Sequence, residues 1–226
     1  LASYPKSGNT LLRSMLSAYF FTVDGKFNFD TIKNIKQFPD FKLFENYGVN
    51  TSDQTEIVKN YINVQNRINQ TDKNSVRFIK THSGLSDING HQFTNLKNSL
   101  GVIYMVRDPR SVVKSYANHN QMTLDKASNR MLEYGATLGG IKNSTNEVDK
   151  IITHMNSWSL NYESWKEFKK FDRYLLIKYE DLINDKEKVF LSILKFVHKL
   201  AKSKFSIDDK KLKNILETTT FEYMQN

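Results

Sequence analysis

The stretch Ser3–Thr10, which reads SYPKSGNT, decides the fold that we predict for this chain. Before it, Leu1–Tyr4 is short and apolar enough to be the end of a buried strand. After it, apolar residues recur at helical spacing, at Leu11, Leu12, Met15, Leu16 and Tyr19. The segment is therefore predicted to be a strand, a tight loop and a helix. The unpaired N–H groups and the dipole at the start of such a helix attract an anion.

The side chains of this loop are suited to a phosphate group. Gly8 lets a ligand approach the backbone, Lys6 supplies a full positive charge, and Ser7 and Thr10 supply hydroxyl donors. The loop is not a Walker A motif, in which the lysine directly follows a glycine and an earlier glycine is required. The alternative interpretation is that Ser7, Asn9 or Thr10 only caps the helix, a role that these residue types commonly take.

Length and composition indicate a single α/β domain. The 226 residues can bury one full core, and we expect one domain spanning 1–226 that is trimmed at its start, because the chain begins inside a strand and without Met. An apolar content of 39% and a charged content of 25% are typical of soluble globular proteins. No apolar run approaches the ~20 residues of a membrane helix.

The net charge and the absence of cysteine limit the kinds of ligand and metal site that we expect. The chain has no Cys, so it has neither disulfides nor thiolate metal sites, and this composition is compatible with the cytoplasmic location that we expect. The net charge of +9 favours anionic partners such as a nucleotide, although solvated lysines such as Lys199, Lys202 and Lys204 also account for it. Without a basic stripe interleaved with aromatic residues, we expect no nucleic-acid binding.

A second predicted strand, over 76–80, ends in the polar sequence Thr81–Gly84. Polar residues at the carboxyl end of a strand in a parallel sheet are where ligands bind. His82 can take a proton from an attacking hydroxyl, and Lys80 points to the same side of the strand. The ordinary alternative for a histidine is a hydrogen-bonded or exposed imidazole, and we adopt it for His91, His119, His154 and His198.

Val102–Val106 is the clearest strand of the chain, continuous and apolar. It leads into Arg107, and Pro109 is placed to start a helix. A guanidinium at the end of this strand, with Ser115 eight residues later, would bind a second phosphate because Arg offers paired N–H donors. The alternative is that Arg107 pairs with Asp108 or caps a helix, and that Ser115 is an ordinary surface residue of the helix.

Two long polar segments are predicted to form loops that shape a substrate pocket. The first covers 24–50, and the second covers 117–144 and is expected to close over the bound substrate. Between and after them we expect helices and one more strand. They are a covering helix over 51–69, a long helix over 147–170, a strand over 174–178, and helices near 189–197 and 210–217. Glu180 and Asp181 are expected to cap the helix that follows them.

Two phosphate motifs in this order resemble the sulfotransferases that use 3′-phosphoadenosine 5′-phosphosulfate (PAPS). YPKSGNT, at residues 4–10, resembles the 5′-phosphosulfate loop of that family, and Lys80-Thr81-His82 resembles the segment that carries its catalytic base. VIYMVRDPRSVVKSY, at residues 102–116, is similar to the family's 3′-phosphate segment, in which an Arg and a Ser eight residues apart hold that phosphate. The resemblance spans Ser3–Met224.

This resemblance implies a three-layer α/β sandwich, similar to P-loop NTPases, with a mostly parallel sheet of about four or five strands. It implies transfer of a sulfuryl group from PAPS to a hydroxyl or amine of a small-molecule, lipid or sugar acceptor, with PAP as the nucleotide product. In this interpretation His82 is the general base, while Lys6 and Lys80 stabilise the leaving group and the sulfuryl oxygens. No metal is needed.

The resemblance also implies adenine contacts at Tyr179, Thr219 and Phe221. The chain departs from the family pattern in four places. Leu11 replaces a usual Trp, Ser83-Gly84 replace a usual Leu-Pro, Asn161 replaces a frequent His, and the Arg-Lys-Gly segment that follows in full-length members is absent. The last departure implies that the domain is trimmed at both ends. Two alternatives therefore stay open, a P-loop-type nucleotide-dependent phosphotransferase and a catalytically inactive relative that binds PAPS or PAP.

Overall fold

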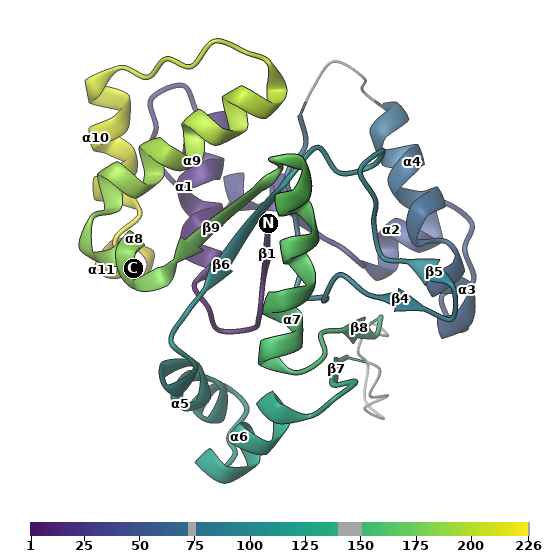
Figure 1. Ribbon diagram of the computed structural model, residues 1–226. Helices are drawn as coiled ribbons and strands as arrows, with labels where there is room; N and C mark the ends of the chain where they lie inside the picture. The colour runs from purple at the N-terminus through teal and green to yellow at the C-terminus, as the bar shows by residue number, and fades with distance from the viewer. Residues whose placement is uncertain (72–75, 140–150, 226) are drawn as a thin grey trace.

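Three parallel strands form the centre of the structure, a computed structural model that describes residues 1–71, 76–139 and 151–225 (Figure 1). They are β1 (Ala2–Ser3), β6 (Val102–Val106) and β9 (Tyr174–Lys178), in the order β1-β6-β9. The first four residues of β6 are buried, as its unbroken apolar sequence predicts. The predicted strands over 102–106 and 174–178 are therefore confirmed.

Two more strands, each of two residues like β1, extend this sheet beyond β1. β2 (Lys36–Gln37) pairs in parallel with β3 (Ile79–Lys80), and Gln37 lies opposite Lys80. Thr81, the residue after β3, bridges Ala2 of β1 in parallel, and its N–H donates to the carbonyl of Leu1 at 2.8 Å. The strand order is thus β2-β3-β1-β6-β9, which confirms a parallel sheet of the expected size. β2 lies in 24–50, where only loops were predicted. The prediction missed this strand because its two polar residues give no strand pattern.

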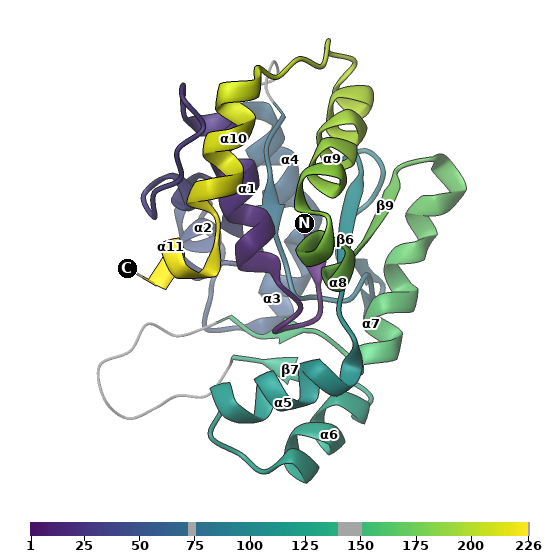
Figure 2. The ribbon, with the colours of Figure 1, turned by 90° about the vertical axis from the view of Figure 1, so that its left-hand side faces the viewer.

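Helices cover both faces of the sheet, as Figures 1 and 2 show. On one face lie α1 (Asn9–Phe21), α8 (Tyr179–Asn184), α9 (Lys186–Ala201) and α10 (Asp209–Thr218), and they share a core with Ile103 and Met105 of β6. On the other lie α3 (Gln54–Lys59), α4 (Tyr61–Thr71) and the 3-10 helix η2 (Trp165–Phe171), whose core includes Val102 and Tyr104. Alternate side chains of β6 thus enter opposite layers, which confirms the three-layer sandwich.

The carboxyl ends of the strands lead into a second group of elements. β6 continues into α5 (Pro109–His119) and α6 (Leu124–Leu132), which lie together at the bottom of Figure 1. β7 (Thr137–Leu138) pairs antiparallel with β8 (Thr153–His154), and α7 (Trp158–Ser164) follows. The remaining short elements are η1 (Thr31–Asn34), α2 (Phe41–Asn46), the hairpin strands β4 (Asp87–Ile88) and β5 (His91–Gln92), and α11 (Phe221–Gln225).

Two helix predictions are wrong in their extent. The helix expected over 51–69 is two helices, because Asn60 ends α3 with a non-helical backbone before α4 starts. The helix expected over 147–170 begins only at Trp158, since β8 is extended, Asn156 has a left-handed φ of 63° and Ser157 caps α7. Residues 147–150 of that prediction, and 140–144 of the predicted closing segment, lie outside the described residues. Within the described ranges, no helix is both long and apolar enough to cross a membrane.

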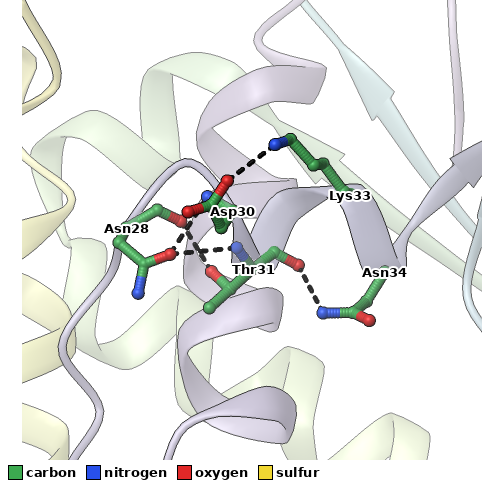
Figure 3. A network of polar contacts seen from close by, with 5 residues as sticks. All are labelled: Asn28, Asp30, Thr31, Lys33 and Asn34. Atoms are coloured by element: carbon green, nitrogen blue, oxygen red, sulfur yellow. Dashed lines mark hydrogen bonds and ion pairs between the residues drawn. The ribbon is translucent and has the colours of Figure 1, made fainter.

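A turn in the 24–50 segment is held by its own side chains (Figure 3). The side-chain oxygen of Asn28 accepts from the backbone N–H groups of Asp30 and Thr31, each at 3.0 Å. Lys33 pairs with Asp30 at 2.6 Å, and Asn34 donates to the carbonyl of Thr31 at 2.9 Å. The turn leads directly into β2, so it fixes where the edge strand of the sheet enters.

Candidate active site

The loop between β1 and α1 has a backbone that only glycine suits at one position. Gly8 has φ of 94°, and a Cβ added there would lie 2.3 Å from Cδ2 of Tyr179 and 2.9 Å from the sulfur of Met105. Lys6 is also left-handed, with φ of 65°. Gly8 is the N-cap of α1 and makes no side-chain cap bond, so capping does not explain Ser7, Asn9 or Thr10. The first N–H groups of α1 are therefore available for a ligand.

Arg107 joins this loop to the ends of two strands. Its Nη1 donates to the carbonyl oxygen of Lys6 at 3.2 Å, and its guanidinium carbon lies 4.4 Å from the centre of the Tyr179 ring. Asp108 pairs instead with Arg110, at 2.5 Å, so Arg107 is not occupied by its neighbour. Lys6 and Gly8 are therefore brought together with Arg107 and Tyr179, which lie far from them in the sequence.

Three buried polar atoms near this junction have no hydrogen-bond partner, namely Oγ of Ser7, Oδ1 of Asn9 and Nε of Arg107. Buried polar groups are nearly always paired in native proteins, so such atoms indicate a ligand or water. Two of the three belong to donor groups, and they lie beside the start of α1. The residues present thus fit a phosphate group, whose oxygens accept hydrogen bonds.

His82 lies beside the same loop. Its Nδ1 is 2.8 Å from the carbonyl oxygen of Ser3, the last residue of β1. Because a carbonyl only accepts hydrogen bonds, Nδ1 carries the proton and Nε2 has the free lone pair. Burial of the imidazole, followed by the charge of Lys80, lowers the pKa of His82 to about 3. The ring is therefore neutral at pH 7, the state that a general base requires.

Cations surround His82. Lys80 donates to the side-chain oxygen of Gln37 at 2.6 Å, and burial, followed by the charge of Arg13, lowers the pKa of Lys80 to about 8. Arg13 donates to the carbonyls of Ile32 and Ile35, at 3.2 and 2.6 Å, next to the turn of Figure 3. Sequence reasoning missed Arg13, although it follows Asn9 by one helical turn and so shares its face of α1.

The loop that carries His82 is bonded along its length to the segment 154–165. Four bonds connect them: Asn161 to the carbonyl of His82 at 3.0 Å, Trp165 to that of Ser83 at 3.0 Å, the N–H of Gly84 to His154 at 2.9 Å, and the N–H of Leu85 to Ser164 at 2.9 Å. Ser83-Gly84 therefore follow a defined path although the usual Leu-Pro is missing. Sequence reasoning had no signal for these bonds.

The remaining residues that were predicted to bind the nucleotide have different surroundings. Thr10 is exposed, and Ser115 is half-buried on α5. Thr219 is fully buried, and its hydroxyl donates to the carbonyl of Ile215 at 2.6 Å, while Phe221 is 51% exposed on α11. Among the described contacts, none joins Ser115, Thr219 or Phe221 to the loop 4–8 between β1 and α1, the predicted phosphate loop, so their nucleotide roles stay predictions.

The expected capping by Glu180 and Asp181 is wrong. Oε1 of Glu180 accepts from the backbone N–H of Asp108 at 3.0 Å, and so holds the start of α5 against α8. α8 already begins at Tyr179, and Asp185 caps α9. As for metal ions, the described part of the chain contains no group of three or more His, Asp or Glu side chains placed to bind one.

Comparison with known proteins bears on the fold and on the family of this chain. Luciferin sulfotransferase of Photinus pyralis is 26% identical over an alignment of 237 residues. The alignment covers all of this chain and 56% of that protein, so the chain spans just over half of its relative's length. A crystal structure of a mouse sulfotransferase complexed with PAP has a TM-score of 0.59 and 18% identity, covering 99% of this chain and 64% of that one, and supports the fold. The model of the sulfotransferase domain family matches residues 1–226, and the chain therefore belongs to that family.

Proposed function

We propose that this chain binds PAPS at the junction of the phosphate loop and Arg107 and transfers its sulfuryl group to an acceptor hydroxyl or amine. One observation carries the proposal. The loop, bonded to Arg107, leaves Ser7 Oγ and Arg107 Nε buried without partners, while Ser3, on the same strand, holds a neutral His82 next to the loop. Anion binding and a general base thus adjoin in one place. Membership of the sulfotransferase domain family supports the same chemistry.

The nucleotide would be held from three directions. The loop residues Lys6, Ser7, Gly8, Asn9 and Thr10, together with the start of α1, would bind the 5′ end through N–H groups, hydroxyls and one full charge. Arg107 and Ser115 would bind the 3′-phosphate. Tyr179, Thr219 and Phe221 would contact the adenine. The mouse relative complexed with PAP supports a bisphosphate nucleotide as the ligand.

Each catalytic group has a defined task in the reaction. Nε2 of His82 removes the proton from the acceptor while the new bond to sulfur forms and the bond from sulfur to the 5′-phosphate oxygen breaks. Lys6 and the loop N–H groups stabilise the charge that appears on that leaving oxygen, which is electrostatic catalysis at the site of developing charge. Lys80 neutralises the sulfuryl oxygens, because a lysine with a pKa of about 8 is still charged at pH 7.

The test is transfer of ³⁵S-labelled sulfate from PAPS to a panel of phenolic, alcoholic, lipid, sugar and amine acceptors. The relative named for luciferin supports placing small-molecule acceptors first in the panel. We expect labelled acceptor with the unchanged chain and a loss of at least 10²-fold with His82→Ala. Binding of PAP without transfer to any acceptor would favour the inactive relative, and activity that requires ATP and Mg²⁺ would favour a phosphotransferase.

A further inference from the structure

Asn161 on α7 is fully buried, yet its amide makes three hydrogen bonds to separate parts of the fold. Nδ2 donates to the carbonyl of His82 at 3.0 Å and to that of Met155 at 2.6 Å. Oδ1 accepts from the hydroxyl of Tyr104 at 2.7 Å. One side chain therefore connects three parts of the fold: the centre of the sheet, the segment before α7 that contains Met155, and the loop of the proposed base.

The orientation of this amide is determined by its partners. The carbonyls of His82 and Met155 only accept hydrogen bonds, so both must face the nitrogen of Asn161. The oxygen then faces Tyr104, whose hydroxyl donates to it. Because Tyr104 lies in the middle of β6 and is itself buried, the amide cannot turn without leaving a buried group unpaired.

His82 is consequently held at two points from two directions. Its ring is held by the carbonyl of Ser3, which fixes the rotation that points Nε2 away from β1. Its backbone is held by Asn161, which fixes how far the residue stands from α7. Asn161 has no solvent-exposed surface, so it acts on the site through His82 and not by touching an acceptor.

We propose that Asn161 is a positioning residue that sets the location of the His82 imidazole. A displacement of about 1 Å in a catalytic group can lower a rate by roughly 10²-fold, so one amide in this place has a large effect on turnover. The inference rests on the proposed function, because it takes His82 as the base. Its test therefore includes a measurement that needs no activity.

Asn161→Ala removes both donors and leaves the carbonyls of His82 and Met155 without this partner. We expect kcat to fall by roughly 10²-fold, with the KM for PAPS and the Kd for PAP within about threefold of those of the unchanged chain. In the free protein, ¹⁵N NMR of the imidazoles should show the pKa of His82 rising by a unit or more toward its ordinary value of about 6.5, because the loosened ring gains water. The signal is assigned by its absence in His82→Ala.

The matched control is Tyr104→Phe, which removes the third bond of Asn161 and keeps both donors to the carbonyls. It should lower Tm, while kcat and the pKa of His82 stay within about threefold and about half a unit of the unchanged chain. If Asn161→Ala does not fold, Asn161→Leu replaces it, since it has a similar size, loses both donors and adds no charge near His82. Lys80, Lys6 and Arg13 face His82 and are unchanged in every variant, so they do not contribute to the difference.

Two results would overturn the inference. One is a folded Asn161 variant in which the pKa of His82 stays where it is in the unchanged chain. The other is a Tyr104→Phe variant that reproduces both the loss of kcat and the shift. If the unchanged chain transfers no sulfuryl group, the proposed function fails, and the NMR measurement alone still decides whether Asn161 positions His82.

Discussion

The two halves of the site differ in how their polar atoms are used. Around the phosphate loop, Oγ of Ser7 and Nε of Arg107 are buried and unpaired. In the loop 82–85, the backbone of each residue instead makes a hydrogen bond to the segment 154–165, although the side-chain Oγ of Ser83 is also buried without a partner. Unpaired buried donors are available to a ligand, whereas backbone groups that are hydrogen-bonded to another segment make the loop rigid. Changes in the first region should therefore alter nucleotide affinity, and changes in the second should alter turnover.

The largest expected effect is that of His82→Ala. It removes the proposed base from the rigid half, so kcat should fall by about 10²- to 10⁴-fold, while the Kd for PAP stays within about threefold. Steady-state kinetics and calorimetry with PAP measure the two quantities separately. Normal turnover in this variant would show that the rigid loop does not carry the base.

Arg107→Ala tests the ligand-binding half. A charged hydrogen bond is worth about 1.5–3 kcal/mol, so PAP should bind roughly 10- to 10²-fold more weakly. Adenosine 5′-phosphate, which lacks the 3′-phosphate, should lose much less. Calorimetry with both nucleotides makes the comparison, and equal losses would remove Arg107 from the 3′-phosphate.

Gly8→Ala separates backbone strain from contact with Tyr179. Gly48→Ala is its matched control, because Gly48 also has a positive φ, of 74°, but nothing lies within 4 Å of an added Cβ. The control should lose about 1–2 kcal/mol of stability from strain alone. Gly8→Ala should lose more and should also bind PAP more weakly, since its Cβ displaces the Tyr179 ring. Thermal unfolding and PAP titration measure the two effects in both variants. Equal losses in Gly8→Ala and Gly48→Ala would show that contact with Tyr179 has no role.

The smallest effect expected is a pH dependence from Lys80. Its pKa of about 8 lies below the ordinary value, so the charged form is present at lower pH and is lost as pH rises through 8. The fraction charged, and with it kcat, should fall about fourfold between pH 7 and pH 8.5. Arginine stays charged over this range, so in Lys80→Arg the plot of kcat against pH should no longer fall between pH 7 and pH 8.5. If kcat falls as before in that variant, the pH dependence belongs to another group.

Local sequence patterns predicted the half of the site that is built from local structure. The phosphate loop, the strand before Arg107 and the position of Tyr179 all follow from periodicity and from residue types that are neighbours in the chain. The rigid half depends on partners far apart: Asn161 and His82 are 79 residues from one another, and Lys80 and Gln37 are 43 apart. Periodicity carries no information on such pairs, and β2, with two polar residues, gives no strand pattern either.

The most direct measurement is a crystal structure of this chain with PAP bound. We expect the 5′-phosphate within hydrogen-bond distance of Ser7 and the first N–H groups of α1, the 3′-phosphate on Arg107, and Nε2 of His82 facing the 5′-phosphate. PAP bound elsewhere, or His82 turned away from the 5′-phosphate, would contradict it.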